Sequence, residues 1–243
     1  RVCLWVVVAM SGASTWAMGF NRIVDRRFDA LTPRTRGRAL PAGQVTLLES
    51  WLLVIVSGAV FFVACFMLNP LALLIAPFAL ALTLLYSLTK RFTWLCHVVL
   101  GLALAFSPLG GWVAVSGSFT GYPWLLSLGV LFWVAGFDTI YACLDADFDR
   151  EAGLKSMPAR FGRRNAFRLA VFFHILAFAL FTATGYVAGL NLFYYAGIVL
   201  TGAALFYQHL AVSPGDLSRI QVSFFSMNGL IALTLFVATW LSL

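Results

Sequence analysis

Two acidic segments carry the side chains best suited to chemistry, and matching positions in them lie 120 residues apart. The first covers residues 21–29 and the second covers residues 138–149. Both contain the pattern Asp-x-x-Phe-Asp, which starts at Asp25 in one segment and at Asp145 in the other. Each segment ends a long apolar stretch, where an ionisable side chain is costly and its default interpretation is functional. The matched carboxylates therefore predict a shared site for divalent cations.

Helical spacing would place most of these polar side chains on one face of each segment, because residues about four or seven apart share a helix face. The residues sharing a stripe are Asn21, Asp25 and Asp29 in the first segment, and Asp138, Tyr141, Asp145 and Asp149 in the second. Asp147 points away from its stripe, so we expect a solvated charge. Mg²⁺ takes one or two carboxylates and completes its shell with water and phosphate oxygens. Each stripe therefore predicts one Mg²⁺ ion, with a pyrophosphate bridging the pair.

Basic side chains lie in the connections close to the acidic stripes. Guanidinium and ammonium groups bind phosphate oxygens, so we expect Arg38, Lys90 and Lys155 to neutralise a leaving pyrophosphate. We interpret five further basic residues as topology signals: Arg36, Arg163, Arg164, Arg168 and Arg219.

The composition indicates a polytopic membrane protein. Hydrophobic residues occupy 62% of the 243 positions and charged residues only 10%, whereas a soluble domain is usually about 45–50% apolar and about 25% charged. The apolar stretches are continuous, which favours helices over the alternating strands of a β-barrel. Because the chain starts at Arg1 inside an apolar stretch, we expect one domain, residues 1–243, that is truncated at its N-terminus.

The predicted fold class is an all-α membrane bundle with eight spans, each long enough for a hydrocarbon core of about 30 Å. The spans cover residues 2–28, 45–68, 70–89, 94–116, 122–149, 166–188, 191–209 and 220–243. Every Lys and Arg except Arg1 lies in alternate connections or the helix ends beside them, and all nine acidic residues share that side. The positive-inside rule places this side in the cytoplasm. Topology thus explains the net charge of +7, and we expect no nucleic-acid partner.

The cysteines and histidines are scattered singly along the spans. Cys3, Cys65, Cys96 and Cys143 have no CxxC spacing, so we interpret them as small buried residues. The three histidines are also isolated in sequence, and His97 alone follows a candidate loop, the one containing Lys90 and Arg91.

Five motifs in order carry a resemblance to a known family. They are NxxxDxxxD from Asn21, RTxxRxLPxG from Arg34, YxxxKR from Tyr86, DxxYAxxDxxxD from Asp138 and GxKS from Gly153. Their order and spacing resemble the UbiA superfamily of intramembrane aromatic prenyltransferases. Within that superfamily, the pattern is most similar to members that prenylate 4-hydroxybenzoate and to their menaquinone-pathway relatives.

The resemblance implies nine helices in two four-helix halves, here about residues 1–118 and 119–243, around a central cavity open to lipid. It also implies Mg²⁺ as cofactor and a role for each matching residue. The implied metal ligands are Asn21, Asp25, Asp29, Asp145 and Asp149; the catalytic residues are Asp25, Asp138 and Asp145; the substrate-binding residues are Arg38, Tyr86, Lys90, Arg91, Tyr141, Lys155 and Ser156. Three departures stand out: Arg22 replaces a frequent Asp, Ala42 replaces a common Ser, and the family's first helix, with an arginine that binds the aromatic acid, is expected to be missing.

The reaction implied is Mg²⁺-dependent transfer of a polyprenyl group from polyprenyl diphosphate to an aromatic acid such as 4-hydroxybenzoate, in ubiquinone or menaquinone biosynthesis. The enzyme would lie in the inner membrane with its active-site loops facing the cytoplasm, and no obligate protein partner is evident. Haem, a chlorophyllide or a glyceryl phosphate remains an alternative acceptor. A cation or proton transporter is the alternative from another class, but it should carry charges near mid-span on broken helices. Here the acids gather at one end, beside basic loops, which favours phosphate chemistry.

Overall fold

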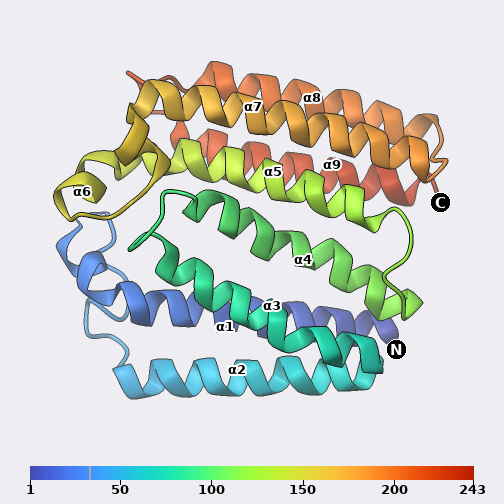
Figure 1. Ribbon diagram of the computed structural model, residues 1–243, viewed down its shortest axis with the longest axis horizontal. Coiled ribbons are helices and arrows are strands. Elements are labelled where there is room, and N and C mark those ends of the chain that lie inside the picture. Colours follow the sequence, from blue (N-terminus) through green and yellow to red (C-terminus); the bar gives the residue numbers. More distant parts are fainter. Residues whose placement is uncertain (33) are drawn as a thin grey trace. The chain divides into compact units, whose positions relative to one another are not determined.

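Helices form almost all the regular structure of the computed structural model, which describes residues 1–32 and 34–243 (Figure 1). The long helices are α1 (Val2–Leu31), α2 (Leu47–Leu68), α3 (Pro70–Thr89), α4 (Cys96–Ser116), α5 (Pro123–Tyr141), α7 (Met157–Val187), α8 (Leu192–Ala211) and α9 (Asn228–Trp240). The shorter ones are the 3₁₀ helix η1 (Ala142–Leu144), α6 (Ala146–Glu151) and the π-helix η2 (Val222–Met227). Within the described ranges, β pairing is limited to an isolated bridge between Ser213 and Asp216. The predicted all-α class is confirmed.

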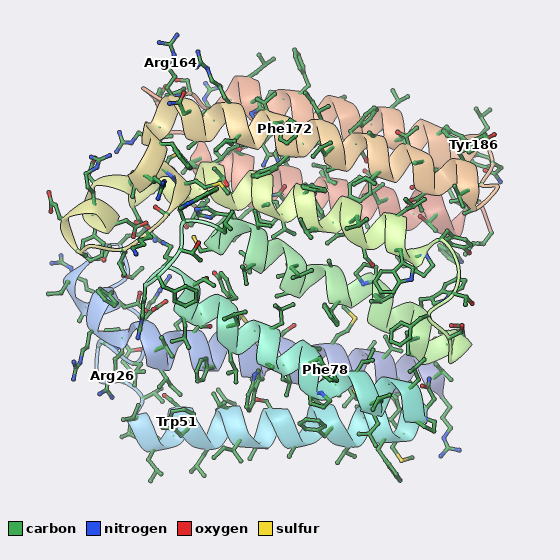
Figure 2. The ribbon with its side chains drawn as sticks, in the orientation of Figure 1. Arg26, Trp51, Phe78, Arg164, Phe172 and Tyr186 are labelled. Carbon is green, nitrogen blue, oxygen red and sulfur yellow. The ribbon has the colours of Figure 1, made fainter. Side chains whose placement is uncertain are left out.

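Seven helical segments of the described chain are long and apolar enough to cross a membrane: α1, α2, α3, α4, α5 with η1, α7, and η2 with α9. Helix α8 matches the remaining predicted span in position, but Gln208 and His209 near its end make it more polar. Phe78 on α3 and Phe172 on α7, which are labelled in Figure 2, are 67% and 54% exposed. Large outward apolar groups suit contact with hydrocarbon. The chain is therefore an integral membrane protein.

Polar side chains in the connections determine where several helices begin. Thr46 and Glu49 form a capping box at the start of α2, in which each side chain accepts a hydrogen bond from the other residue's N–H. Asn69 caps α3 and also donates from its amide to the carbonyl of Val113 in α4, at 2.8 Å. Ser156 caps α7. These caps satisfy backbone N–H groups that a helix start leaves unpaired.

The first compact unit consists of Arg1–Lys90 and Phe106–Phe119. In this unit α1 packs along α2, and α3 contacts both helices. Gly12 lets α1 approach α2 closely, because a Cβ atom there would lie 2.9 Å from the Ser57 carbonyl oxygen. Buried Phe61 and Leu80 belong to the apolar core beneath this contact. The packing fixes α1, whose last turns carry the first acidic segment.

The second compact unit consists of Arg91–Ala105 and Thr120–Leu243. Here α5 packs along α7, and α8 packs against α7 and α9. Buried Ile140 and Cys143 share a core cluster with Phe167 of α7, which anchors the end of α5 where the second acidic segment begins. The two compact units differ from the predicted halves, 1–118 and 119–243, in the assignment of residues 91–105. The internal repeat itself stays a prediction.

The predicted span 122–149 is not one helix, and the prediction of a continuous stripe through Asp138, Asp145 and Asp149 is wrong. Helix α5 ends at Tyr141, η1 follows, and Asp145 leaves the helical conformation with φ −100° and ψ 6° before α6 begins. Asp is a weak helix former that favours N-cap positions, and Asp145 occupies the N-cap of α6. The break turns the later carboxylates away from the direction that an ideal helix would give them.

Helix α7 begins at Met157, earlier than the predicted start at residue 166. Gly162 interrupts the helix with φ 78° and ψ 156°, a conformation that glycine adopts without the steric cost of a side chain. The predicted span missed the first turns of α7 because it was placed from apolar residues, and these turns are rich in charged residues.

Candidate functional site

The first acidic segment lies on the last turns of α1, which is continuous from Val2 to Leu31. Asn21 and Asp25 are one turn apart, and the Asn21 amide donates to the Asp25 carboxylate, Nδ2 to Oδ2, at 3.0 Å. Asp29 follows one turn later, and its side chain is only 8% exposed. One helix therefore presents three oxygen-bearing side chains at successive turns, as predicted from their spacing.

Asp29 and Arg38 are in direct contact. Nη1 of Arg38 donates to Oδ1 of Asp29 at 2.6 Å, and Nη1 of Arg22 lies 4.0 Å from Oδ2. The connection after α1 turns back toward the helix because Thr35 donates from its hydroxyl to the Asp29 carbonyl oxygen at 3.0 Å. A predicted metal ligand is thus paired with a predicted phosphate-binding arginine.

The first unit also contains the predicted substrate-binding residues of α3. Tyr86 lies in the last turns of this helix, and Lys90 occupies its C-cap position. Helix α3 packs against α1. The charges of Asp25, Asp29 and Tyr86 all act on Arg22, so the end of α3 lies close to the acidic turns of α1. Arg91, the next predicted residue, begins the second unit.

The second acidic cluster lies at the start of α6. Asp145 occupies the N-cap position of this helix, and the N–H of Asp149 donates to the Asp145 carbonyl oxygen at 2.7 Å. Asp149 is buried, with 2% exposure. Asp147 is exposed and forms ion pairs with Arg150 at 3.3 Å and Arg163 at 2.9 Å. The solvated position predicted for Asp147 is confirmed, and Arg163 has a structural partner there.

Asp138, on α5, is hydrogen-bonded to His97 at the start of α4. Nδ1 of His97 lies 2.6 Å from Oδ2 of Asp138, although the residues are 41 positions apart. The opposite ring nitrogen, Nε2, accepts from the Met157 backbone N–H at 3.3 Å. His97 is fully buried. The sequence signalled this contact only through the position of His97 after the candidate loop.

The other two histidines are also paired in space. Nδ1 of His174 in α7 lies 2.8 Å from Nε2 of His209 in α8. These two histidines are isolated in the sequence, and helix packing brings them together in the fold. This pair lies on the face of α7 that contacts Gly136.

The loop before α7 contains the predicted Lys155 and Ser156. Nζ of Lys155 donates to the Phe92 carbonyl oxygen at 3.3 Å, and the Cys96 thiol donates to the Lys155 carbonyl oxygen at 3.6 Å. Ser156 is fully buried and accepts from the N–H of Ala159, which caps α7. In this arrangement Ser156 holds the loop in place and Lys155 is exposed at its surface.

Tyr141 belongs to an aromatic group that the sequence did not indicate. Its ring centroid is 4.2 Å from that of Phe224 in η2, and Phe137 lies 5.3 Å from Phe224 in an edge-on arrangement. The π-helix thus places an aromatic face beside the last turn of α5. Such faces stabilise cations, and here they neighbour the start of the second acidic segment.

The donor chemistry of the carboxylates fits Mg²⁺. In the part of the chain that the structure describes, no cluster of three or more His, Cys, Asp or Glu residues forms a complete metal cage. Mg²⁺ is usually held by one or two carboxylates together with substrate phosphates, so a complete cage is not required. Oδ2 of Asp29 is buried and lacks a hydrogen-bond partner, which leaves a hard oxygen for such an ion.

Helices that can cross a membrane carry carboxylates and basic residues at their ends, an arrangement typical of an intramembrane enzyme. The chain matches the model of the UbiA prenyltransferase family over residues 1–230, and it belongs to that family. It is therefore a prenyltransferase, and the resemblance predicted from the motifs is confirmed.

The similarity to known proteins extends over almost the whole chain. The 4-hydroxybenzoate octaprenyltransferases of Citrobacter koseri and Cronobacter sakazakii are each 33% identical over 98% of this chain and 83% of their own length. The apo structure of a UbiA homologue from Aeropyrum pernix K1 has a TM-score of 0.91 and 34% identity, covering 99% of this chain and 89% of that one. A UbiA homologue from Archaeoglobus fulgidus bound to DMAPP and Mg²⁺ shares the fold, with a TM-score of 0.69 and 17% identity over 97% of this chain and 88% of that one.

Proposed function

We propose that this protein transfers a polyprenyl group from polyprenyl diphosphate to the ring of an aromatic acid, with 4-hydroxybenzoate as the acceptor. The observation that carries the proposal is that each compact unit has an Asp-x-x-Phe-Asp segment followed by a connection with a basic residue. Arg38 pairs with Asp29 in the first unit, and Lys155 lies in the connection after Asp149 in the second. The sequence relatives named 4-hydroxybenzoate octaprenyltransferase support the choice of acceptor.

The carboxylates and basic residues have separate tasks in this proposal. Asn21, Asp25 and Asp29 would hold one Mg²⁺, and Asp145 and Asp149 would hold a second. Bound Mg²⁺ would supply Lewis-acid stabilisation of the charge that develops on the departing diphosphate. Arg38, Lys90 and Lys155 would donate charge-assisted hydrogen bonds to its oxygens, while Tyr86, Arg91 and Ser156 stay predicted contributors to substrate binding.

The ring proton of the acceptor also needs a base. As the prenyl C–O bond breaks, diphosphate leaves with the electron pair and the allylic carbon bonds to the ring. We assign the lost ring proton to the Asp138 carboxylate. Tyr141 lies one helical turn from Asp138, and its ring packs against that of Phe224. An aromatic ring at this position would stabilise the prenyl cation through its electron-rich face. Apolar surroundings would also protect that cation from water.

We place the protein in the inner membrane, with its charged loops in the cytoplasm and its product entering ubiquinone or menaquinone biosynthesis. The clustering of every Lys and Arg except Arg1 on one side supports this topology. The transporter alternative fits less well, because Asp25 and Asp29 lie in the last turns of α1 and Asp145 lies beyond the end of α5.

One product assay tests the proposal. The protein in lipid nanodiscs is given Mg²⁺, a polyprenyl diphosphate and a panel of phenolic acids, and the lipid product is identified by mass. We expect prenylated 4-hydroxybenzoate, with no product after EDTA treatment and recovery when Mg²⁺ is restored. Prenylation of haem, a chlorophyllide or a glyceryl phosphate, with every phenolic acid unchanged, would replace the proposed acceptor.

A further inference from the structure

His97 uses both ring nitrogens in hydrogen bonds, and the two partners indicate which nitrogen donates and which accepts. A backbone N–H only donates, so Nε2 must accept from Met157 and cannot carry a hydrogen. The hydrogen of the neutral ring is then on Nδ1, which donates to Oδ2 of Asp138 at 2.6 Å. This assignment, made from the hydrogen-bond network, makes His97 a hydrogen-bond donor to the Asp138 carboxylate through Nδ1.

The two side chains differ in access. The side chain of Asp138 is 21% exposed, whereas that of His97 is 1% exposed. A substrate can therefore reach Asp138 but not His97. Oδ2 of Asp138 is engaged with the ring, and Oδ1 is the oxygen on which an incoming proton can be placed.

The same histidine connects three elements of the second unit. It lies on α4, its acceptor Asp138 lies on α5, and its donor Met157 begins α7. Next to it, Cys96 and Phe92 contact Lys155 through the two hydrogen bonds of the loop before α7. The orientation of Asp138 is thus coupled to the segment that carries Lys155.

We propose that His97 is a positioning residue: it holds Asp138 through Oδ2, with Oδ1 directed to receive the proton that the aromatic acceptor loses. This inference deepens the proposed function and depends on it. The new carbon–carbon bond makes the substituted ring carbon tetrahedral, and loss of its proton to Oδ1 of Asp138 returns the C–H electron pair to the ring and restores aromaticity. The resulting carboxylic acid of Asp138 releases the proton to solvent after product release.

The test compares His97→Leu with His97→Gln in the full protein. A glutamine offers an N–H donor for Asp138 and a carbonyl acceptor for Met157, whereas leucine offers neither. Losing a hydrogen bond to a charged group should lower kcat by about 10- to 100-fold in His97→Leu, and KM for polyprenyl diphosphate should stay the same. His97→Gln should recover most of the lost kcat, and His174→Gln, a change at another buried histidine of the unit, should leave kcat unchanged.

The outcomes separate positioning from simple stability and from the proposed function itself. Wild-type kcat in His97→Leu, or equal losses in both His97 variants that follow their thermal midpoints, would overturn the inference. Asp138→Asn should stop turnover while Mg²⁺-dependent binding of polyprenyl diphosphate persists. Normal turnover in Asp138→Asn would remove the role of His97 but leave the prenyl transfer intact. A wild-type protein that prenylates no aromatic acid would instead refute the proposed function and, with it, the inference.

Discussion

At the residue scale, three of the carboxylates proposed for the reaction already have hydrogen-bonding partners of different charge. Asp25 accepts from the neutral amide of Asn21, Asp29 pairs with the cation of Arg38, and Asp138 is bonded to His97. A divalent ion arriving at Asp29 would compete with the guanidinium group of Arg38, and at Asp25 it would compete with the Asn21 amide. Each of these carboxylates must therefore exchange or share an existing contact when it takes part in the reaction.

Arg38→Ala should raise KM for polyprenyl diphosphate by about 10- to 100-fold, because a charge-assisted hydrogen bond to a phosphate oxygen is lost. The Mg²⁺ concentration for half-maximal activity should not rise, since Arg38 no longer competes for Asp29. Arg36→Ala is the matched control, because Arg36 lies exposed in the same connection; its kinetics should resemble the wild type. Equal KM values for the two variants would contradict the role of Arg38.

The sequence predicted these residues better than their contacts. Spacing was sufficient for Asn21, Asp25 and Asp29, because one continuous helix carries them. The sequence predicted separate roles for Asp29 and Arg38 but not their contact. The two residues are nine positions apart and are joined by a turn, which helical spacing does not predict. The bond between His97 and Asp138 depends on how α4 packs against α5, and no local pattern encodes such a contact.

At the element scale, close helix contacts and one irregular helix set the geometry around the second acidic segment. The approach of α4 to α5 at Gly101 leaves no room for a side chain, because a Cβ atom would overlap the Leu131 carbonyl group. The π-helix η2 places Phe224 over Tyr141. The pattern of apolar residues could not predict the break after α5, because the chain changes direction at Asp145 while the hydrophobic stretch before it is uninterrupted.

Gly101→Ala should destabilise the protein by about 1–3 kcal/mol through overpacking, measured as a lower thermal midpoint in nanodiscs. Gly110→Ala, on the same helix, meets open space and should not lower the midpoint, because alanine is the better helix former. A midpoint for Gly101→Ala equal to that of Gly110→Ala would show that α4 and α5 are farther apart than the structure gives.

Gln208→Leu should also lower the thermal midpoint. The Gln208 amide donates to the Ser223 carbonyl oxygen of η2 at 2.8 Å in a buried position. Removing the donor leaves a buried acceptor unsatisfied, which costs about 1–3 kcal/mol. Tyr207→Phe, at the exposed neighbouring position, is the control and should be neutral. An unchanged midpoint in Gln208→Leu would mean that the π-helix does not depend on this bond.

At the scale of the whole molecule, we expect the charged residues to set the orientation of the protein in the membrane. In a background without native cysteines, Gly37→Cys should react with a membrane-impermeant thiol reagent only from the cytoplasmic side, because the positive-inside rule places that loop there. Ser118→Cys, in a connection without Lys or Arg, should react only from the opposite side. Labelling of both positions from one side would contradict the proposed topology.

We propose that each acidic segment binds the diphosphate through Mg²⁺. The most direct measurement is Mg²⁺-dependent binding of a non-hydrolysable polyprenyl diphosphate analogue to the protein in nanodiscs, comparing Asp25→Ala and Asp145→Ala with Asp147→Ala. Asp147 lies in the same cluster but is exposed and paired with Arg150 and Arg163. We expect Mg²⁺-dependent binding in the wild type and Asp147→Ala, and its loss by at least about 100-fold in the other two variants. Binding that needs no Mg²⁺, or that survives at full strength in Asp25→Ala and Asp145→Ala, would contradict the account.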